Sequence, residues 1–266
     1  MMRALGILNK MPTSFVHPVQ YKLKLGDDNV LLNELLGKEI QIKWTGNIYC
    51  ILCGRKTKKS FGEGLCYPCF MNAPESAECI LHPELCKAHL HEGRDPEWEE
   101  KHHNQPHFVY LALTSDVKVG ITRDTQIPTR WIDQGAAAAI ILAQTPYRQK
   151  AGEIEVFLKQ FMTDKTQWNK MLTNITAAER NLVEEKQKAT NLLPEDLRIF
   201  VNDSNEVLWL EYPVINYPAK VSSLSLDKID DIKLKLNGIR GQYLLFESGK
   251  VLNIRKHSGY EVELIA

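Results

Sequence analysis

Apolar and polar residues alternate with a period of two near both ends of the chain. The alternation runs through residues 21–25 and 40–44, and again through 233–236 and 261–264. A period of two is typical of strands that bury one face. We therefore predict antiparallel β structure over an N-terminal segment, 1–46, and a C-terminal segment, 195–266. We expect the two segments to join in one small barrel into which the rest of the chain is inserted.

Two dipeptides near the C-terminus indicate tight turns. Ser248-Gly249 and Ser258-Gly259 each lie between apolar runs. Small residues of this kind are favoured in two-residue hairpin connections. We expect both to be hairpin turns.

The pattern changes over residues 47–104, which are rich in Cys, His, Gly, Pro and charged residues and show little periodicity. Such a segment cannot build an apolar core of its own, so bound metal must supply its order. Residues 105–174 then read as strand, strand, helix, strand and helix, and 175–194 as a connecting helix. The predicted fold class is α+β, with a zinc-binding segment followed by a ββαβα domain between terminal β segments.

Charge and targeting signals narrow the choice of partners. The 266 residues include 33 Lys and Arg and 33 Asp and Glu, so the formal net charge is zero. A nucleic-acid partner would therefore need a local basic surface. The N-terminus has no apolar run of the kind a signal peptide needs, and no stretch approaches the roughly 20 apolar residues that span a bilayer. We expect a cytoplasmic protein that does not associate with membranes.

Four of the six cysteines form two C-x2-C pairs, Cys50 with Cys53 and Cys66 with Cys69, separated by twelve residues. Two residues between thiolates let both sulfurs reach one ion, and four sulfurs are a standard closed set for structural zinc. A redox pair, an iron–sulfur cluster and chance burial are the alternatives. The sequence predicts a first zinc site here.

A second cluster follows, in which Cys79, Cys86 and His89 have the spacing C-x6-C-x2-H. His103 is our choice for a fourth ligand, because a short helix over 96–101 can carry it back; His102 and His91 are its competitors. Free thiols and surface histidines are the alternative. The sequence thus predicts one or two structural zinc ions.

The segment 108–168 resembles the GIY-YIG domain. Phe108-Val109-Tyr110, then Val117-Lys118-Val119-Gly120-Ile121-Thr122, then Arg130 and then Glu155 follow its motif order, closest to a compact bacterial and phage branch. The whole chain also resembles a bacterial family of uncharacterised zinc-binding proteins.

The resemblance to GIY-YIG nucleases implies metal-assisted phosphodiester hydrolysis. By this resemblance, Tyr110 takes part in activating water, Arg130 contacts the phosphate, and Glu155 holds a Mg²⁺ or Mn²⁺ ion. Lys118 stands where the second motif has tyrosine, and we count it with the candidate catalytic residues. Arg130 lies further beyond Gly120 than is usual, so Arg123 competes for its role.

Each of these residues also has a structural alternative. Tyr110 could be a packing residue in a strand, Arg130 a surface residue paired with Asp133, and Glu155 a solvated residue. Two functions therefore stay open. One is a nuclease acting on DNA or RNA, and the other is a non-catalytic module that binds DNA or RNA on a degenerate GIY-YIG fold.

A basic run precedes Phe61 between the two C-x2-C pairs. It contains Lys56, Lys58 and Lys59. Such a run can follow a phosphate backbone while an aromatic ring stacks on a base. With Arg123, these lysines are the candidate nucleic-acid-binding residues; a solvated hairpin tip is the alternative.

Overall fold

A computed structural model describes residues 2–175 and 179–266 of the chain. Its contacts divide the chain into two compact units. Unit 1 contains residues 1–71, 172–174 and 211–266, and unit 2 contains residues 72–171 and 175–210. The segment predicted to bind zinc, 47–104, is therefore shared between the units.

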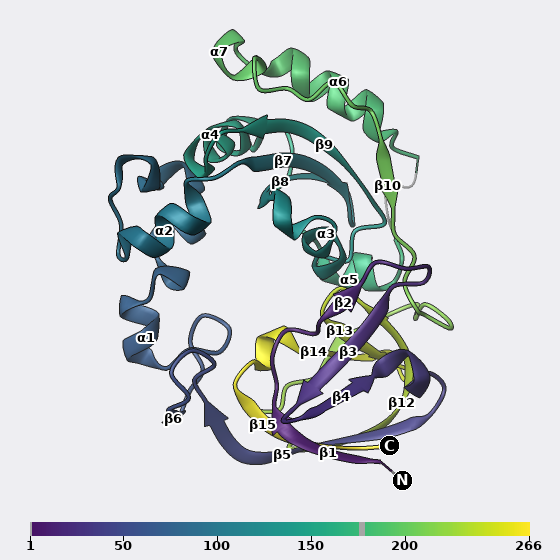
Figure 1. The fold of residues 1–266 in the computed structure, drawn as a ribbon. Coiled ribbons are helices and arrows are strands. Elements are labelled where there is room, and N and C mark those ends of the chain that lie inside the picture. The colour runs from purple at the N-terminus through teal and green to yellow at the C-terminus, as the bar shows by residue number, and fades with distance from the viewer. Residues whose placement is uncertain (1, 176–178) are drawn as a thin grey trace. The chain divides into compact units, whose positions relative to one another are not determined.

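Unit 1 is built on a sheet in which the two ends of the chain are neighbours (Figure 1). Its strands follow the order β1 (Arg3–Ile7), β15 (Tyr260–Ile265), β5 (Glu39–Tyr49), β12 (Asp231–Arg240), β13 (Tyr243–Phe246), β14 (Lys250–Asn253) and β11 (Ser222–Ser223). A further short strand, β6 (Lys56–Thr57), pairs with β5. A separate sheet contains β2 (Thr13–Ser14), β3 (Gln20–Leu25) and β4 (Asp28–Leu31).

The period-two pattern is explained by the burial of these strands. Along β3, exposed and buried residues alternate without exception, with Tyr21, Leu23 and Leu25 pointing into the core. The pairing of β15 with both β1 and β5 joins the terminal segments as expected. The mixed α+β class is likewise present.

The expected barrel is not formed. Among the described residues no sheet closes, because the large sheet runs from β1 at one edge to the two-residue strand β11 at the other. Closure would require those edges to pair with a consistent stagger. The turn at Ser258-Gly259 is also not a hairpin turn between neighbours, since β15 pairs with β5 and β1 while β14 pairs with β13. Ser248-Gly249 does connect a hairpin, between β13 and β14.

Unit 2 contains the predicted ββαβα order (Figure 1). Its elements are β7 (His107–Leu113), β8 (Val117–Arg123), α3 (Thr129–Asp133), β9 (Ala138–Thr145) and α4 (Arg148–Leu158). β7 lies between β8 and β9, and β10 (Val207–Trp209) pairs with the far edge of β9; all these pairs are antiparallel. Residues of β7, β8, β9, α4 and α6 share one apolar core.

Helices complete the two units. They are α1 (Tyr67–Asn72), α2 (Pro96–His103), α5 (Trp168–Leu172), α6 (Leu182–Leu192) and α7 (Glu195–Arg198). The helix α6 begins after Asn181, whose side-chain oxygen accepts a hydrogen bond from the Val183 amide at 3.0 Å. It is the helix expected over 175–194, although residues 176–178 lie outside the described part of the chain. No helix of the described residues is long and apolar enough to cross a membrane.

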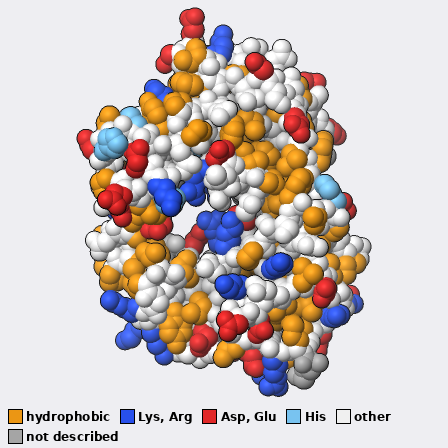
Figure 2. All heavy atoms as spheres, in the orientation of Figure 1, with side chains coloured by type: hydrophobic (Ala, Val, Ile, Leu, Met, Phe, Trp, Pro, Cys, Tyr) orange, Lys and Arg blue, Asp and Glu red, His pale blue; other side chains and the backbone are white. Residues whose placement is uncertain are grey.

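Basic and acidic side chains are interspersed with apolar ones over the face shown in Figure 2. This distribution agrees with the formal net charge of zero. Any site for an anionic partner must therefore be sought in a local cluster of cationic groups.

Candidate functional site

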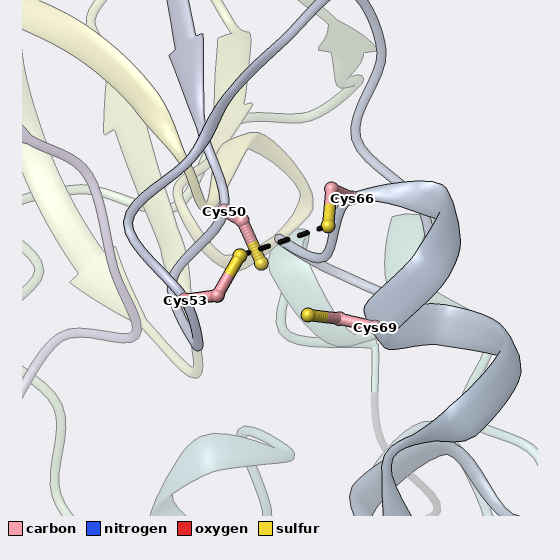
Figure 3. Close-up of side chains that lie close together, drawn as sticks. All are labelled: Cys50, Cys53, Cys66 and Cys69. Atoms are coloured by element: carbon pink, nitrogen blue, oxygen red, sulfur yellow. Dashed lines mark hydrogen bonds between the residues drawn. The ribbon is translucent and has the colours of Figure 1, made fainter.

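The first cysteine group is formed where β5 ends and α1 begins. Cys50 follows β5, Cys53 lies in the turn after it, and Cys66 and Cys69 lie just before and on α1. The four sulfur atoms all lie within 4.8 Å of one another, and the sulfurs of Cys53 and Cys66 are 3.8 Å apart. Figure 3 shows the four side chains pointing toward one another. This geometry fits a single tetrahedral ion.

Local structure favours an ionised sulfur at Cys50. Cys50 and Cys66 are buried and pack with Leu65. Burial opposes ionisation of Cys50, but backbone amides of Cys53, Cys66 and Leu52 hydrogen-bond to its sulfur and lower its pKa to about 6. Amides aimed at a sulfur stabilise the thiolate that a metal requires. The four cysteines can therefore hold a zinc ion, and no ligand position is left open for chemistry.

A second group of potential ligands lies in unit 2. Cys79 lies on the short 3-10 helix Glu78–Ile80, Cys86 follows the 3-10 helix Pro83–Leu85, and Glu99 and His103 are four residues apart on α2. Their ligand atoms lie within 4.8 Å of one another. The Cys86 sulfur is 3.6 Å from Nδ1 of His103, which is 3.7 Å from a carboxylate oxygen of Glu99. We name these four residues the Cys79 group.

All four members of the Cys79 group are buried, and Glu99 and His103 are only 2% and 4% exposed. Burying a carboxylate beside two thiols is costly unless a cation compensates the charge. Hydrogen bonding from Cys79, opposed by burial, lowers the pKa of Cys86 to about 4, so a thiolate is favoured there. The donor set of two sulfurs, one nitrogen and one oxygen fits zinc.

The ligands of the Cys79 group differ from the prediction at one position. Cys79, Cys86 and His103 converge as predicted, but the fourth donor is Glu99 and not His89. The His89 ring instead stacks on Tyr147, with centroids 4.4 Å apart and planes within 4°. The competing histidines are engaged elsewhere: Nδ1 of His102 is 2.6 Å from the Trp98 carbonyl oxygen, and His91 pairs with Glu100. The spacing of Glu99 and His103, one helical turn apart, was the signal that could have identified Glu99.

A cavity of about 470 Å³ lies in unit 2 between β8, α3, α4 and the segment before β7. Four predicted catalytic residues line it: Tyr110, Lys118, Arg130 and Glu155. Arg123, predicted as a nucleic-acid contact, lines the same cavity. The other nucleic-acid candidates, Lys56, Lys58 and Lys59, are exposed residues of unit 1.

Tyr110 and Gly120 face each other across β7 and β8 in register. Tyr110 is fully buried, and its hydroxyl donates a 3.0 Å hydrogen bond to the side-chain oxygen of Gln134. Its ring lies edge-on to Trp131. Burial raises the pKa of Tyr110, and the nearby positive charge of Arg130 offsets part of that increase. Tyr110 is thus a neutral phenol at pH 7, held in a defined orientation.

The carboxylate of Glu155 lies in a mixed electrostatic environment. Burial raises the pKa of Glu155, while Lys159 and Lys118 lower it. Nζ of Lys159 is 3.3 Å from Glu155 and 3.4 Å from the Asp164 carboxylate, so an ammonium group lies between the two. Two carboxylates that share a cation mark a position where a divalent metal ion can be held.

Lys118 is 7% exposed, and its ammonium donates a 3.1 Å hydrogen bond to the Asp164 carbonyl oxygen. Burial, together with the positive charge of Arg130, lowers the pKa of Lys118 to about 8. The backbone of Thr163 also bridges β8 at Lys118. The loop that carries Asp164 is thereby fixed to the strand that carries Lys118.

Several cavity residues were not predicted from the sequence. Asp164, Lys159, Gln134 and Arg148 all line the cavity. Lys159 follows Glu155 by one helical turn, a spacing that indicates an ion pair on a helix. Asp164 had no comparable signal, because a loop residue is brought to the cavity only by the bridge to β8.

Comparison with known proteins identifies a family. The family model described as "Protein of unknown function (DUF2797)" matches residues 37–262, and the chain belongs to this family. No curated protein matches the chain. No solved structure matches it either.

Proposed function

We propose that the cavity in unit 2 is the active site of a nuclease of the GIY-YIG type, which cleaves phosphodiester bonds of DNA or RNA with a divalent metal ion. The observation that carries this proposal is that Tyr110, Arg130 and Glu155, which lie far apart in the sequence, line one cavity. The order β7, β8, α3, β9, α4 also agrees with the ββαβα arrangement of the GIY-YIG domain.

In this proposal Glu155 and Asp164 hold the metal ion. A Mg²⁺ or Mn²⁺ ion bound there would supply positive charge to phosphate oxygens and would favour ionisation of the attacking water. The ammonium of Lys159, now between the two carboxylates, stands in for that charge. With a metal ion bound by these carboxylates, Lys159 would be free to face the substrate.

The remaining residues bind and orient the substrate. Arg130 offers a planar pair of N–H donors to the phosphate oxygens. Lys118, with its pKa of about 8, is protonated at pH 7 and adds a second positive charge. Tyr110 is neutral at pH 7, as an ordinary phenol is, and burial raises its pKa further, so it acts as a hydrogen-bonding group that orients the water and not as a phenolate base.

The exposed lysines of unit 1 supply a second nucleic-acid contact in this proposal. The ammonium of Lys59 lies 5.3 Å from the Phe61 ring centroid, and Phe61 stacks on Phe70 at 5.9 Å. With Lys56 and Lys58 they give charge and aromatic surface together, as single-strand-binding surfaces do.

Two observations favour a non-catalytic alternative. Lys118 occupies the position of the second motif's tyrosine, and Glu155 is already neutralised by Lys159. A degenerate site of this kind could bind nucleic acid without cleaving it. Binding with no cleavage under either metal ion would support this alternative.

The decisive experiment compares Glu155→Gln with the parent protein on labelled single-stranded DNA, duplex DNA and RNA, with Mg²⁺ or Mn²⁺. Glutamine keeps the volume of Glu155 but loses the charge that holds a cation, so cleavage should be abolished while binding changes by less than about threefold. Glu153→Gln is the matched control, because Glu153 lies on the same helix and pairs with Lys150 at the surface. Cleavage by Glu155→Gln at the parent rate would refute the proposal.

A further inference from the structure

The cavity of unit 2 has two chemically different walls. Residues from β7 onward contribute its charged groups, including Lys118, Arg130 and Glu155. The segment before β7 contributes Ile80, Leu81 and Trp98, which are apolar or aromatic. Ligand pockets of 300–1,000 Å³ commonly combine an apolar surface with a few polar groups that fix orientation. This cavity, at about 470 Å³, has its charged groups on β8, α3 and α4 and an indole and two aliphatic side chains on the segment before β7, although Val119 and Ile121 of β8 also line it.

The apolar wall is built by the Cys79 group. Ile80 and Leu81 lie in the loop between Cys79 and Cys86, and Trp98 precedes Glu99 on α2. His103, another member of the group, lines the cavity itself. The residues that can hold a metal ion are thus the same residues that hold the wall in shape.

Trp98 has a fixed orientation in this wall. The backbone amide of Trp98 donates a 3.0 Å hydrogen bond to the Asp95 side chain, which caps the start of α2, and the indole is held by its ring contacts. The indole stacks on His102, with centroids 4.1 Å apart and an interplanar angle of 21°, and meets His103 edge-on at 5.1 Å. An aromatic ring held in place on a half-buried surface loses little conformational entropy when a planar ligand stacks on it.

The apolar wall is fastened to the helix that carries Glu155. The Arg148 guanidinium, on the first turn of α4, donates hydrogen bonds of 3.0–3.2 Å to the carbonyl oxygens of Cys79 and Ile80. At Gly152, one turn along α4, a Cβ atom would lie 2.3 Å from the Glu84 amide nitrogen, so only glycine permits this contact. The spacing between the two walls is therefore fixed.

We propose that the wall formed by the Cys79 group binds a nucleobase next to the scissile phosphate, with Trp98 as its principal contact. This inference rests on the proposed function and adds the part of the substrate that the cavity recognises. A nucleotide is itself divided into an anionic phosphate and a flat apolar base, which matches the two walls. Base stacking on an aromatic side chain accepts any base, so the contact positions the strand without reading its sequence.

The test uses the full-length protein with its zinc content measured for every variant, and a 12-nucleotide single-stranded DNA as the probe. Binding is measured in Ca²⁺, and cleavage separately in Mg²⁺ and Mn²⁺. Trp98→Ala should weaken binding on the order of 5- to 100-fold, the range expected for loss of one stacked base. Trp98→Phe should retain most of the affinity, because a ring remains. Trp209→Ala is the control, since Trp209 is an exposed tryptophan of the same unit that does not line this cavity.

Photo-crosslinking provides a readout that does not depend on cleavage. A probe carrying one 5-iodouracil, moved along the strand, should crosslink to Trp98 from a position adjoining the cleaved bond. An abasic residue at that position should weaken binding to the parent protein but not to Trp98→Ala.

The outcomes separate the two proposals. Crosslinking at Trp98 without cleavage by the parent would support the base contact and refute the nuclease. Cleavage with unchanged affinity of zinc-replete Trp98→Ala would refute the base contact and leave the nuclease intact. Failure of the parent to bind this probe, duplex DNA and RNA alike would overturn both.

Discussion

The hydroxyl of Tyr110 lies against Gly120 on the neighbouring strand, where a Cβ atom would come within 2.6 Å of the phenolic oxygen and 2.8 Å of the ring. The two residues are paired in register between β7 and β8. Glycine at this position lets the tyrosine ring lie flat across the sheet and reach Gln134. The two motif residues are therefore one packing unit.

Gly120→Ala should displace Tyr110. An added methyl group in a packed interior costs about 1–3 kcal/mol, and here it also weakens the Tyr110–Gln134 hydrogen bond. The free energy of unfolding, measured with denaturant, and the cleavage rate should both fall. In a Tyr110→Leu background the same substitution should cost less, and a double-mutant cycle measures the difference. Additive effects would contradict the proposed packing unit.

Cys66→Ser should remove the zinc ion from the first cysteine group. Binding energy at structural zinc sites is folding energy, on the order of 10 kcal/mol, so the segment around Cys50–Cys69 should lose its order. Elemental analysis should show one zinc fewer per chain, and proteolysis should cut this segment. A well-folded variant with the parent's zinc content would exclude the assignment.

The Cys79 group predicts a second zinc ion held by Glu99 and not by His89. Glu99→Ala should lower the zinc content from two ions to one, because a buried ligand is lost. His89→Ala should leave two. Glu100→Ala is the matched control, since Glu100 is the next residue on α2 and is partly exposed. Loss of zinc in His89→Ala with full retention in Glu99→Ala would reverse the ligand assignment.

The pH dependence of stability should report the burial of Lys118. Its folded pKa of about 8 is below the roughly 10.4 of an unfolded lysine, so between these values the unfolded state binds more protons. The free energy of unfolding should therefore rise with pH from 8 to 10 in the parent relative to Lys118→Met. Near pH 7 the methionine variant should be more stable by up to about 3 kcal/mol.

Urea unfolding followed by circular dichroism at several pH values measures this difference. The exposed Lys165 provides a control, because Lys165→Met should change the unfolding free energy by less than about 0.5 kcal/mol. Parallel pH profiles for the parent and Lys118→Met would show that Lys118 is not desolvated.

Replacing Lys56, Lys58 and Lys59 by alanine should reduce the salt dependence of nucleic-acid binding. Each phosphate contact contributes about 0.9 to the slope of log affinity against log salt on a duplex, so the slope should fall by up to about 3. Alanine replacement of the exposed lysines 22, 24 and 38 in the same unit is the control. An equal slope for both triple variants would mean that the hairpin lysines are simply solvated.

Local patterns in the sequence were sufficient to predict several features of the structure. Two C-x2-C pairs bring four sulfurs together through short turns, and the structure contains this group. Alternation of apolar residues identified β3, β5, β12 and β15, because a strand with one buried face must repeat every two residues. The ββαβα order was predicted in the same way. In each case the determining interactions lie within a few residues of one another.

Long-range packing decided the rest. The choice of Glu99 over His89 depends on α2 facing the loop between Cys79 and Cys86, and Asp164 reaches the cavity only through the bridge at Thr163. The sheet of unit 1 stays open because its edges do not meet, although each strand has the pattern of a barrel strand. A residue pattern records which face of an element is buried. It does not record which distant element covers that face, and that choice, made by packing in three dimensions, created the two-walled cavity.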